Sequence, residues 1–311
     1  MEVLKLREPE TGAELMVAPG LGMNAFSWQL PIENRQVEIL WSEPDFESGD
    51  QRPSGSGTPL LFPFPGRIAK GLLDWEGRQF QLPQGDGRGN AIHGFVLNRA
   101  WRVIEQSDAS VTAEFQASLD LENWEQYWPA DFIMRCRYRL RPAELEISLE
   151  VENPDQRRLP CGLGLHPYFQ ADTNDPDLKV QLPVSAKWEL DSLIPTGVQQ
   201  SFSSETMFKG PMEVAGRDFD DVLTGIDFQN EVAQFVIDDV QRGVQVTQTW
   251  GTEFPHCVVY IPPHRQAICI EPYSCLPNAA ALHRQGVSSG MWILDPGELK
   301  RMAVHLQVGS I

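Results

Sequence analysis

The chain has 311 residues, of which 41% are hydrophobic and 22% charged, as is typical of a soluble globular protein with a sizeable core. Its 25 lysines and arginines are outnumbered by 43 aspartates and glutamates, which gives a formal net charge of -18. Such a charge repels nucleic-acid phosphates and anionic lipid surfaces, so neither nucleic acid nor membrane is an expected partner.

Targeting and redox signals point to the cytoplasm. Residues 1–15 contain no uninterrupted apolar core of the kind a secretory signal needs, and no segment approaches the ~18 apolar residues of a membrane-spanning helix. The cysteines are odd in number, widely spaced and without a CxxC pair, so we expect reduced, structural thiols. They are Cys136, Cys161, Cys257, Cys269 and Cys275.

Short β-type segments bounded by Gly, Pro, Asn and Asp recur along the chain and predict an antiparallel sandwich or barrel. Proline and glycine interrupt the sequence often, and no long amphipathic helix is visible. Short helical turns are expected around 98–101 or 273–282. The predicted strands fall, in chain order, within residues 35–41, 78–83, 101–106, 110–119, 132–140, 144–153, 179–184, 232–238, 243–250, 256–263, 266–273 and 301–308.

One polar segment, residues 42–59, is rich in Gly, Ser and Pro and reads as a long surface loop rather than a domain linker. Large all-β folds often exceed the usual domain size as one unit, so we expect a single domain over residues 1–311. No internal repeat, P-loop or GxGxxG motif accompanies these elements.

The stretch GLGLHPYF, residues 162–169, places a histidine before a proline. Pro167 disfavours helix at His166, so the imidazole should project from a strand or a strand end. On a functional interpretation, Gly162 and Gly164 leave room beside the strand for a ligand. The alternative is a core histidine beside a tight turn.

A second segment, QAICIEPYSCLPNA, repeats this arrangement with a carboxylate. The apolar run Ile268–Ile270 leads into Glu271, which Pro272 follows. A buried carboxylate without partners is costly, and its pKa rises into the range that suits a general base. The alternative is a solvated glutamate at the end of a strand.

Three further segments carry candidate polar groups. Arg67 in FPFPGRIAKG could form paired hydrogen bonds from its guanidinium group to sugar hydroxyls or to a carboxylate, or it could be a surface arginine. His93 in NAIHGFVLNRAW could donate a hydrogen bond into a pocket, or be a satisfied core group. The acidic turn in GRDFDDVLTG, with Asp218, Asp220 and Asp221, could face a site or simply be solvated.

Taken together, the segments PGRIAKG, NAIHGF, GLGLHPYF, FDDVLTG, ICIEPYSCLPNA and LDPGE occur in the order found in aldose 1-epimerases, the galactose mutarotase family. The chain resembles this family over roughly residues 15–308, and HPYF with the downstream Glu-Pro is the most specific part. The resemblance implies an all-β fold, a large antiparallel β-sandwich (supersandwich) with an open carbohydrate-binding cleft. It also implies no cofactor and a small-molecule sugar substrate, bound by a monomer or homodimer.

Roles follow from the matched motifs. The resemblance makes Glu271 the general base, His166 the general acid, His93 the second active-site histidine and Arg67 a substrate-binding arginine. Asp220 is the expected sugar-binding aspartate, with Asp221 as the competing register. Two departures bear on the identity of the sugar: the arginine follows Phe-Pro-Gly rather than Ala-Asn, and His93 precedes Gly-Phe rather than Gly-Gly.

The implied activity is that of an isomerase that interconverts the α and β anomers of a free hexose such as glucose or galactose. Glu271 would take the C1 hydroxyl proton while His166 protonates the ring oxygen, and His93 would stabilise charge there. This scheme predicts an acid limb of the pH profile from Glu271 and an alkaline limb from His166. A metal held by His93, His166 and Glu271 is disfavoured, since HxH and HxxxH spacings are absent.

Two alternatives remain open. A hexose-6-phosphate 1-epimerase would need local cations against the overall charge, and only Arg67 lies in a matched motif, with Arg99 and Arg265 as candidates at the rim. This favours the neutral sugar. The other alternative is a non-catalytic sugar-binding protein on the same fold, because fold alone does not establish turnover.

Overall fold

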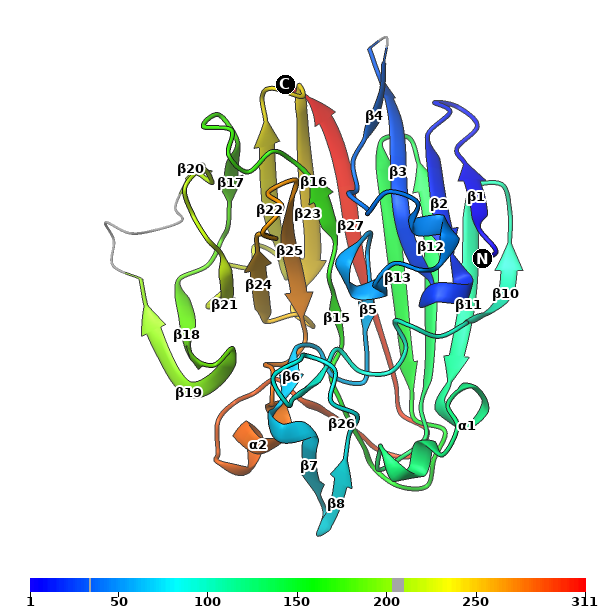
Figure 1. The fold of residues 1–311 in the computed structure, drawn as a ribbon, viewed down its shortest axis with the longest axis vertical. Helices are drawn as coiled ribbons and strands as arrows, with labels where there is room; N and C mark the ends of the chain where they lie inside the picture. The colour runs from blue at the N-terminus through cyan, green and yellow to red at the C-terminus, as the bar shows by residue number, and fades with distance from the viewer. Residues whose placement is uncertain (34, 203–209) are drawn as a thin grey trace.

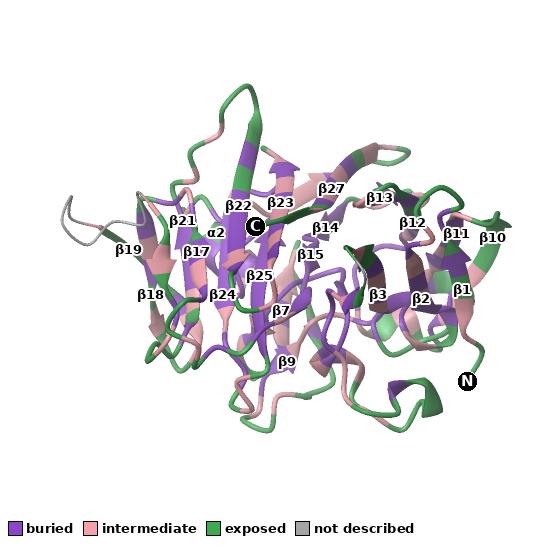
Figure 2. Cartoon of the chain, turned by 90° about the horizontal axis from the view of Figure 1, so that it is seen from above, coloured by how far each residue is buried: buried purple, intermediate pink, exposed green. Residues whose placement is uncertain are grey.

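The computed structural model describes residues 1–33, 35–202 and 210–311, and in this part of the chain the strands form two stacked layers (Figures 1 and 2). One layer is a long antiparallel sheet, here called the back sheet. Its strands, in spatial order, are β10 (Arg102–Gln106), β11 (Ser110–Gln116), β12 (Ile133–Arg141), β13 (Glu144–Glu152), β27 (Leu299–Ser310), β23 (Val244–Gly251), β22 (Val232–Asp239), β17 (Lys179–Gln181) and β20 (Met212–Glu213).

The second layer contains the sheet that carries the candidate site, here called the pocket sheet. Its strands, in spatial order, are β19 (Ile194–Ser201), β18 (Ala186–Asp191), β21 (Asp220–Thr224), β24 (His256–Tyr260), β25 (Ala267–Tyr273), β15 (Gly164–Leu165) and β5 (Leu60–Leu61), and β16 (Tyr168–Gln170) also pairs with β25. The same layer holds the sheet of β1 (Leu4–Arg7), β2 (Glu14–Ala18), β3 (Asn24–Ile32) and β4 (Arg35–Glu38) (Figure 2).

Smaller elements surround these sheets. The short strand pairs are β14 (Leu159–Cys161) with β26 (Trp292–Leu294), β6 (Arg67–Ile68) with β9 (Ala91–Ile92), and β7 (Leu72–Trp75) with β8 (Arg78–Gln81). The α-helices are α1 (Ala117–Asp120) and α2 (Ala279–Arg284), and the 3₁₀ turns span Pro19–Leu21, Phe46–Ser48, Pro53–Gly55, Ala69–Gly71 and Trp124–Gln126.

Alternating burial along the strands explains the two layers. β13 alternates along its whole length between half-buried polar residues and buried apolar ones, and β12 and β23 follow the same period of two. In β25 every residue is buried, because one face packs on the back sheet and the other lies under the pocket. Ile268 and Ile270 join the core cluster that includes Met134, Val304 and Leu306 of the back sheet.

The all-β antiparallel sandwich predicted from the sequence is confirmed, and each predicted strand segment overlaps a strand of the structure. The helical turn expected within 273–282 corresponds in part to α2, whereas residues 98–101 contain a turn and no helix. The five cysteines are buried and free of disulfides.

The interpretation of residues 42–59 as a surface loop is only partly correct. Ser54, Ser56 and Thr58 are buried, and the segment packs against β3 and β16. Asn24 holds it through its side-chain amide, which donates to the carbonyl of Ser56 at 2.9 Å, and through its side-chain oxygen, which accepts from the N–H of Thr58 at 2.8 Å. Buried polar backbone needs such partners, and a polar sequence alone does not reveal them.

Replacing Ile270 by alanine should lower the free energy of unfolding by about 2–5 kcal/mol, because a core side chain is lost and the rigid sandwich cannot collapse into the space. Urea denaturation followed by circular dichroism measures this change. Ile104→Ala is the matched control: that side chain is 54% exposed on β10, so its loss should change stability by no more than about 0.5 kcal/mol. Equal losses in the two variants would contradict the assignment of Ile270 to the core.

Candidate active site

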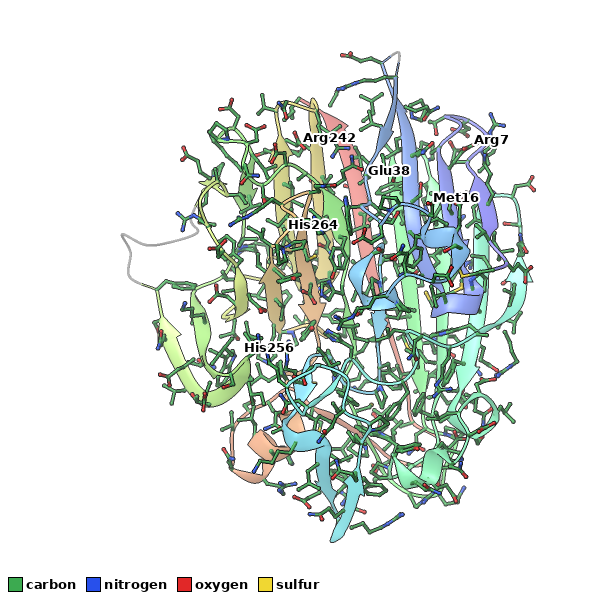
Figure 3. All side chains as sticks on the ribbon, in the orientation of Figure 1. Arg7, Met16, Glu38, Arg242, His256 and His264 are labelled. Carbon is green, nitrogen blue, oxygen red and sulfur yellow. The ribbon has the colours of Figure 1, made fainter. Side chains whose placement is uncertain are left out.

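A pocket of about 400 Å³ lies on the face of the pocket sheet that points away from the core. This volume is in the range of about 300–1,000 Å³ in which small-molecule sites fall. Strands β16, β25, β24 and β21 supply its floor, and the segments around residues 43–55, 66–67, 88–93 and 260–264 supply its walls. Figure 3 labels His264, which lines the pocket beyond the end of β24, and His256, the first residue of β24.

His166 and Glu271 meet in this pocket because of strand register. Gly164 pairs with Tyr273 and Tyr168 pairs with Cys269, so the same register places residue 166 directly opposite residue 271. Cross-strand partners project from the same face of a sheet. The His166 Nε2 and Glu271 Oε1 atoms lie 3.4 Å apart.

The two prolines act at this same strand boundary. The N–H of Tyr168 donates to Gly57 and its carbonyl accepts from Trp41, so the main-chain groups of Tyr168 point away from β25. These groups alternate in direction along a strand, so those of residues 165 and 167 face β25. Pro167 and its counterpart Pro272, opposite Leu165, cannot donate there. His166 and Glu271 therefore form a pair without backbone hydrogen bonds between them, the arrangement in which cross-strand side chains come closest.

Both groups are almost removed from water, with exposures of 6% for His166 and 1% for Glu271. Among the described residues, His166 Nδ1 and Glu271 Oε2 have no hydrogen-bond partner. Buried polar atoms are rarely left unpaired, so these two atoms mark positions where a polar ligand would complete the site.

Burial sets the charge of this pair. Desolvation lowers the pKa of His166 to about 3 and raises the pKa of Glu271 well above its ordinary value. The imidazolium expected from the sequence is thus disfavoured in the ligand-free pocket. Both shifts disfavour the charged forms, so the carboxyl group keeps its proton to a higher pH than a solvated glutamate does.

His93 lies beside this pair, with its ring centroid 5.8 Å from that of His166. Desolvation, and then the neighbouring His166 and Arg67, lower the pKa of His93 well below its ordinary value. Its Nδ1 accepts the Gly66 N–H at 3.3 Å, so in the neutral ring Nε2 carries the proton and is the hydrogen-bond donor.

Backbone strain fixes this ring. His93 has φ 62°, and Gly94, which follows it, has φ 76°. A Cβ at Gly94 would lie 1.9 Å from the carbonyl oxygen of Phe62, so only glycine fits there. His93 is followed by Gly-Phe rather than Gly-Gly, and the glycine that is kept, Gly94, is the one that the close approach of Phe62 requires.

Arg67, on β6, reaches the pocket with a paired guanidinium group. Its Nε lies 3.2 Å from Asp86 Oδ2. Desolvation would raise the pKa of Asp86, but hydrogen bonds from Asn90 and the Arg88 N–H, together with Arg67, lower it to about 2. Arg67 is thereby held as a fixed donor.

The two aspartates of the Asp-Asp turn face opposite ways. Asp220 pairs with Tyr260 of β24 and lines the pocket. Asp221 points to the other side of the strand, where Lys187 donates to it at 3.0 Å. Asp218 lies outside the pocket and is paired with Arg265 at the surface.

Aromatic rings enclose the pair. Tyr168 stacks on the His166 ring with centroids 4.6 Å apart and an interplanar angle of 1°. Tyr260 meets the same ring edge-on at 6.0 Å, and Tyr273 also lines the pocket. The rings pack around the imidazole, and a hydrogen bond from Tyr273 to Glu271 opposes the rise in the pKa of that carboxyl group.

The interpretation of Gly162 and Gly164 as space for a ligand is wrong. A Cβ at Gly162 would lie 2.1 Å from Cys275 Sγ, and one at Gly164 would lie 2.8 Å from Pro65 and 2.9 Å from Tyr273. The room beside this strand is filled by the protein's own side chains, and the glycines allow that close packing.

Two arginines of the pocket wall, Arg52 and Arg88, were not identified from the sequence. Both lie in polar loop segments outside the recognised motifs, and no periodicity marks them. The arginines considered from the sequence lie elsewhere: Arg265 pairs with Asp218, and Arg99 does not line the pocket.

Over residues 1–33, 35–202 and 210–311, no group of three or more His, Cys, Asp or Glu side chains is placed to hold a metal ion. Within the same ranges, no helix is long and apolar enough to cross a membrane.

The fold and the pocket together define a galactose mutarotase-like β-sandwich. A galactose mutarotase-like protein from Clostridium acetobutylicum superposes with a TM-score of 0.84 at 24% identity, covering 97% of this chain and 94% of that one. Galactose 1-epimerase from Lactobacillus acidophilus NCFM superposes with a TM-score of 0.74 at 17% identity, covering 97% and 93%.

Sequence comparison agrees with the fold. The family described as aldose 1-epimerase matches residues 10–307, so the chain belongs to the aldose 1-epimerase family. YihR, a protein of Escherichia coli K12, is 27% identical over 229 residues, which cover 71% of this chain and 70% of that protein.

The raised pKa of Glu271 predicts that Glu271→Gln stabilises the protein at neutral pH. The folded wild type must keep a proton that the unfolded chain releases above about pH 4.5, so its stability falls as pH rises. The advantage of the variant should be absent below about pH 4.5. Above that it should grow by about 1.4 kcal/mol per pH unit until the folded-state pKa is reached.

Urea denaturation at several pH values measures this difference. Glu105→Gln, an exposed change on β10, is the control and should follow the wild type at every pH. A Glu271→Gln variant that is less stable than the wild type at pH 7 would contradict a protonated, desolvated carboxyl group at this position.

Proposed function

We propose that the protein is an aldose 1-epimerase that interconverts the α and β anomers of an aldohexose, such as glucose or galactose, by acid–base ring opening. The observation that carries the proposal is the buried His166–Glu271 pair, 3.4 Å apart, with an unpartnered polar atom on each member. Family membership supports the reaction class.

The reaction needs one base and one acid that can exchange roles. In ring opening, the Glu271 carboxylate removes the proton of the C1 hydroxyl while the His166 imidazolium protonates the ring oxygen, and the C1–O5 bond breaks to leave an aldehyde. After rotation about C1–C2, His166 takes the proton back from the O5 hydroxyl, which attacks the other face of the aldehyde, and Glu271 returns its proton to the carbonyl oxygen.

A single proton shared by the pair suffices for both stages. The protonated carboxyl with neutral imidazole, which burial favours, is the state required beside the open-chain sugar. The carboxylate with imidazolium is required beside the ring form. Substrate hydroxyls that hydrogen-bond to the pair would offset the cost of forming these charges, so the pocket favours the open-chain stage more than water does.

The other lining groups have positioning roles in this scheme. His93 donates through Nε2 toward the oxygen on which charge develops, Arg67 bridges two sugar oxygens with its fork, and Asp220 accepts from a hydroxyl at the opposite wall. None of these groups needs to change its protonation state during turnover.

Glu271→Gln should retain sugar binding and lose activity by about 10²–10⁴-fold, because the amide is nearly isosteric but cannot accept the C1 proton. Polarimetry of freshly dissolved α-glucose and α-galactose measures the rate, and calorimetry measures binding. Asp221→Asn, on the opposite face of the strand that carries Asp220, is the control and should keep its activity. Rapid mutarotation by Glu271→Gln would remove this carboxylate from the mechanism.

The pKa directions reverse the assignment of the pH limbs expected from the sequence. With one proton on the pair, activity should fall at low pH as His166 gains a second proton and at high pH as Glu271 loses the only one. Between these limits the profile of kcat/KM should be flat and wide.

Side-chain ¹⁵N chemical shifts in labelled, sugar-free protein test this order directly, with His166→Asn used to assign the signals. The His166 ring should remain neutral between about pH 5 and pH 8. An imidazolium signal from His166 at pH 6 would restore the original assignment.

A further inference from the structure

The pocket wall carries positive charge that the acid–base chemistry does not use. Arg52 and Arg88 both line the pocket, and neither has a carboxylate partner among the described residues. Arg67, by contrast, is paired with Asp86. Both arginines are exposed residues at the pocket wall, so their guanidinium groups are accessible to a ligand in the pocket.

The backbone that carries Arg52 is fixed over the pocket. The Tyr168 hydroxyl donates to the Ser54 carbonyl at 2.8 Å, and the Asn24 amide donates to the Pro53 carbonyl at 3.2 Å. The N–H of Gly55 closes the turn on the Arg52 carbonyl at 3.1 Å. The residue that stacks on His166 thus also anchors the loop that presents Arg52.

Arg88 is presented by a second built turn. Its N–H donates to Asp86 Oδ1 at 2.8 Å, and the Asn90 N–H donates to the same oxygen at 2.9 Å. The other oxygen of Asp86 holds Arg67. One carboxylate therefore fixes the backbone at Arg88 and the guanidinium of Arg67 together.

Both unpaired arginines act on the centre of the site. Desolvation lowers the pKa of His166, and Arg52 lowers it further. Desolvation raises the pKa of Asp220, and the positive charges of Arg67 and Arg88 oppose that rise. The two guanidinium groups therefore lie within electrostatic reach of a ligand in the pocket, Arg52 on the side of His166 and Arg88 on the side of Asp220.

We propose that the aldose bound here carries an anionic substituent away from the anomeric carbon, a phosphate or a carboxylate, which Arg52 and Arg88 bind. This inference rests on the proposed function and narrows its substrate class. Guanidinium forks match the geometry of such oxyanions, whereas hydroxyl groups alone need no net positive charge. From the sequence, the neutral sugar was favoured because the net charge of -18 opposes an anionic ligand and only Arg67 lay in a matched motif.

The test compares glucose, glucose 6-phosphate and glucuronate as substrates. Exchange NMR between the anomers at equilibrium gives the catalysed rate for each, after subtraction of the rate without enzyme. The wild type is compared with Arg52→Gln, Arg88→Gln and the double variant. Arg99→Gln is the matched control, because that arginine lies outside the pocket.

We expect a higher kcat/KM for the anionic sugars than for glucose in the wild type. In the Arg52→Gln/Arg88→Gln variant, kcat/KM should fall by about 10- to 100-fold for the anionic sugars. For glucose, kcat/KM should change by no more than about twofold. Added salt should weaken the preference of the wild type and have little effect on the double variant. If glucose 6-phosphate is preferred and glucuronate is not, the substituent is a phosphate, and the reverse result identifies a carboxylate.

Equal kcat/KM for neutral and anionic sugars in the wild type, or equal losses for both in the double variant, would overturn the inference. Binding to the Glu271→Gln protein separates this failure from failure of the proposed function, because calorimetry requires no turnover. Anion-dependent binding that is lost in Arg52→Gln/Arg88→Gln supports the inference even if no sugar is epimerised. Equal affinities for glucose and glucose 6-phosphate in Glu271→Gln would reject it.

Discussion

The structure of the site depends on one register, which sets His166 opposite Glu271 between β15, β16 and β25. A shift of β25 by one residue would turn Glu271 into the core and bring Ile270 to the pocket face. The core face of β25 prevents that shift, because Ile268 and Ile270 are anchored against the back sheet. The hydrophobic sandwich therefore determines where His166 and Glu271 lie, and the prolines beside them interrupt the backbone hydrogen bonds where the two side chains approach each other.

The same burial that positions the pair makes it costly. A carboxyl group that is 1% exposed and lacks a partner for one oxygen destabilises the folded chain, as does a histidine that cannot be charged. A well-packed apolar pair at these positions would be more stable. The cost is consistent with a site whose missing hydrogen bonds are completed only by a ligand, and in which a proton moves between two groups held at unfavourable pKa values.

The sequence was sufficient for the fold class and for choosing His166 and Glu271, which the structure brings together, and not for the rest of the pocket. Alternating strands such as β12 and β13 are visible because their period is local, and HPYF and Glu-Pro are visible because proline constrains its neighbour. Arg52 and Arg88 were missed because their position depends on contacts from Tyr168, Asn24 and Asp86, which are distant along the chain or shaped by a turn. The lowered pKa of His166 was not foreseen for a related reason, since desolvation by burial is a property of the packed site.

The net charge of the whole chain is a poor guide to the charges that surround the pocket. A net charge of -18 argues against an anionic ligand only if the charge is evenly spread, and it is not. Burial raises the pKa of Glu271, Asp86 is occupied by Arg67, and Asp221 and Asp218 are paired outside the pocket with Lys187 and Arg265. Arg52 and Arg88 then stand at the pocket wall beside Glu43 and Asp220, and solvent screens the distant surface charges more than it screens these near ones. The excess of acidic residues then acts at long range on the rate of encounter, while the few unpaired charges at the pocket wall act at short range on whatever ligand enters it.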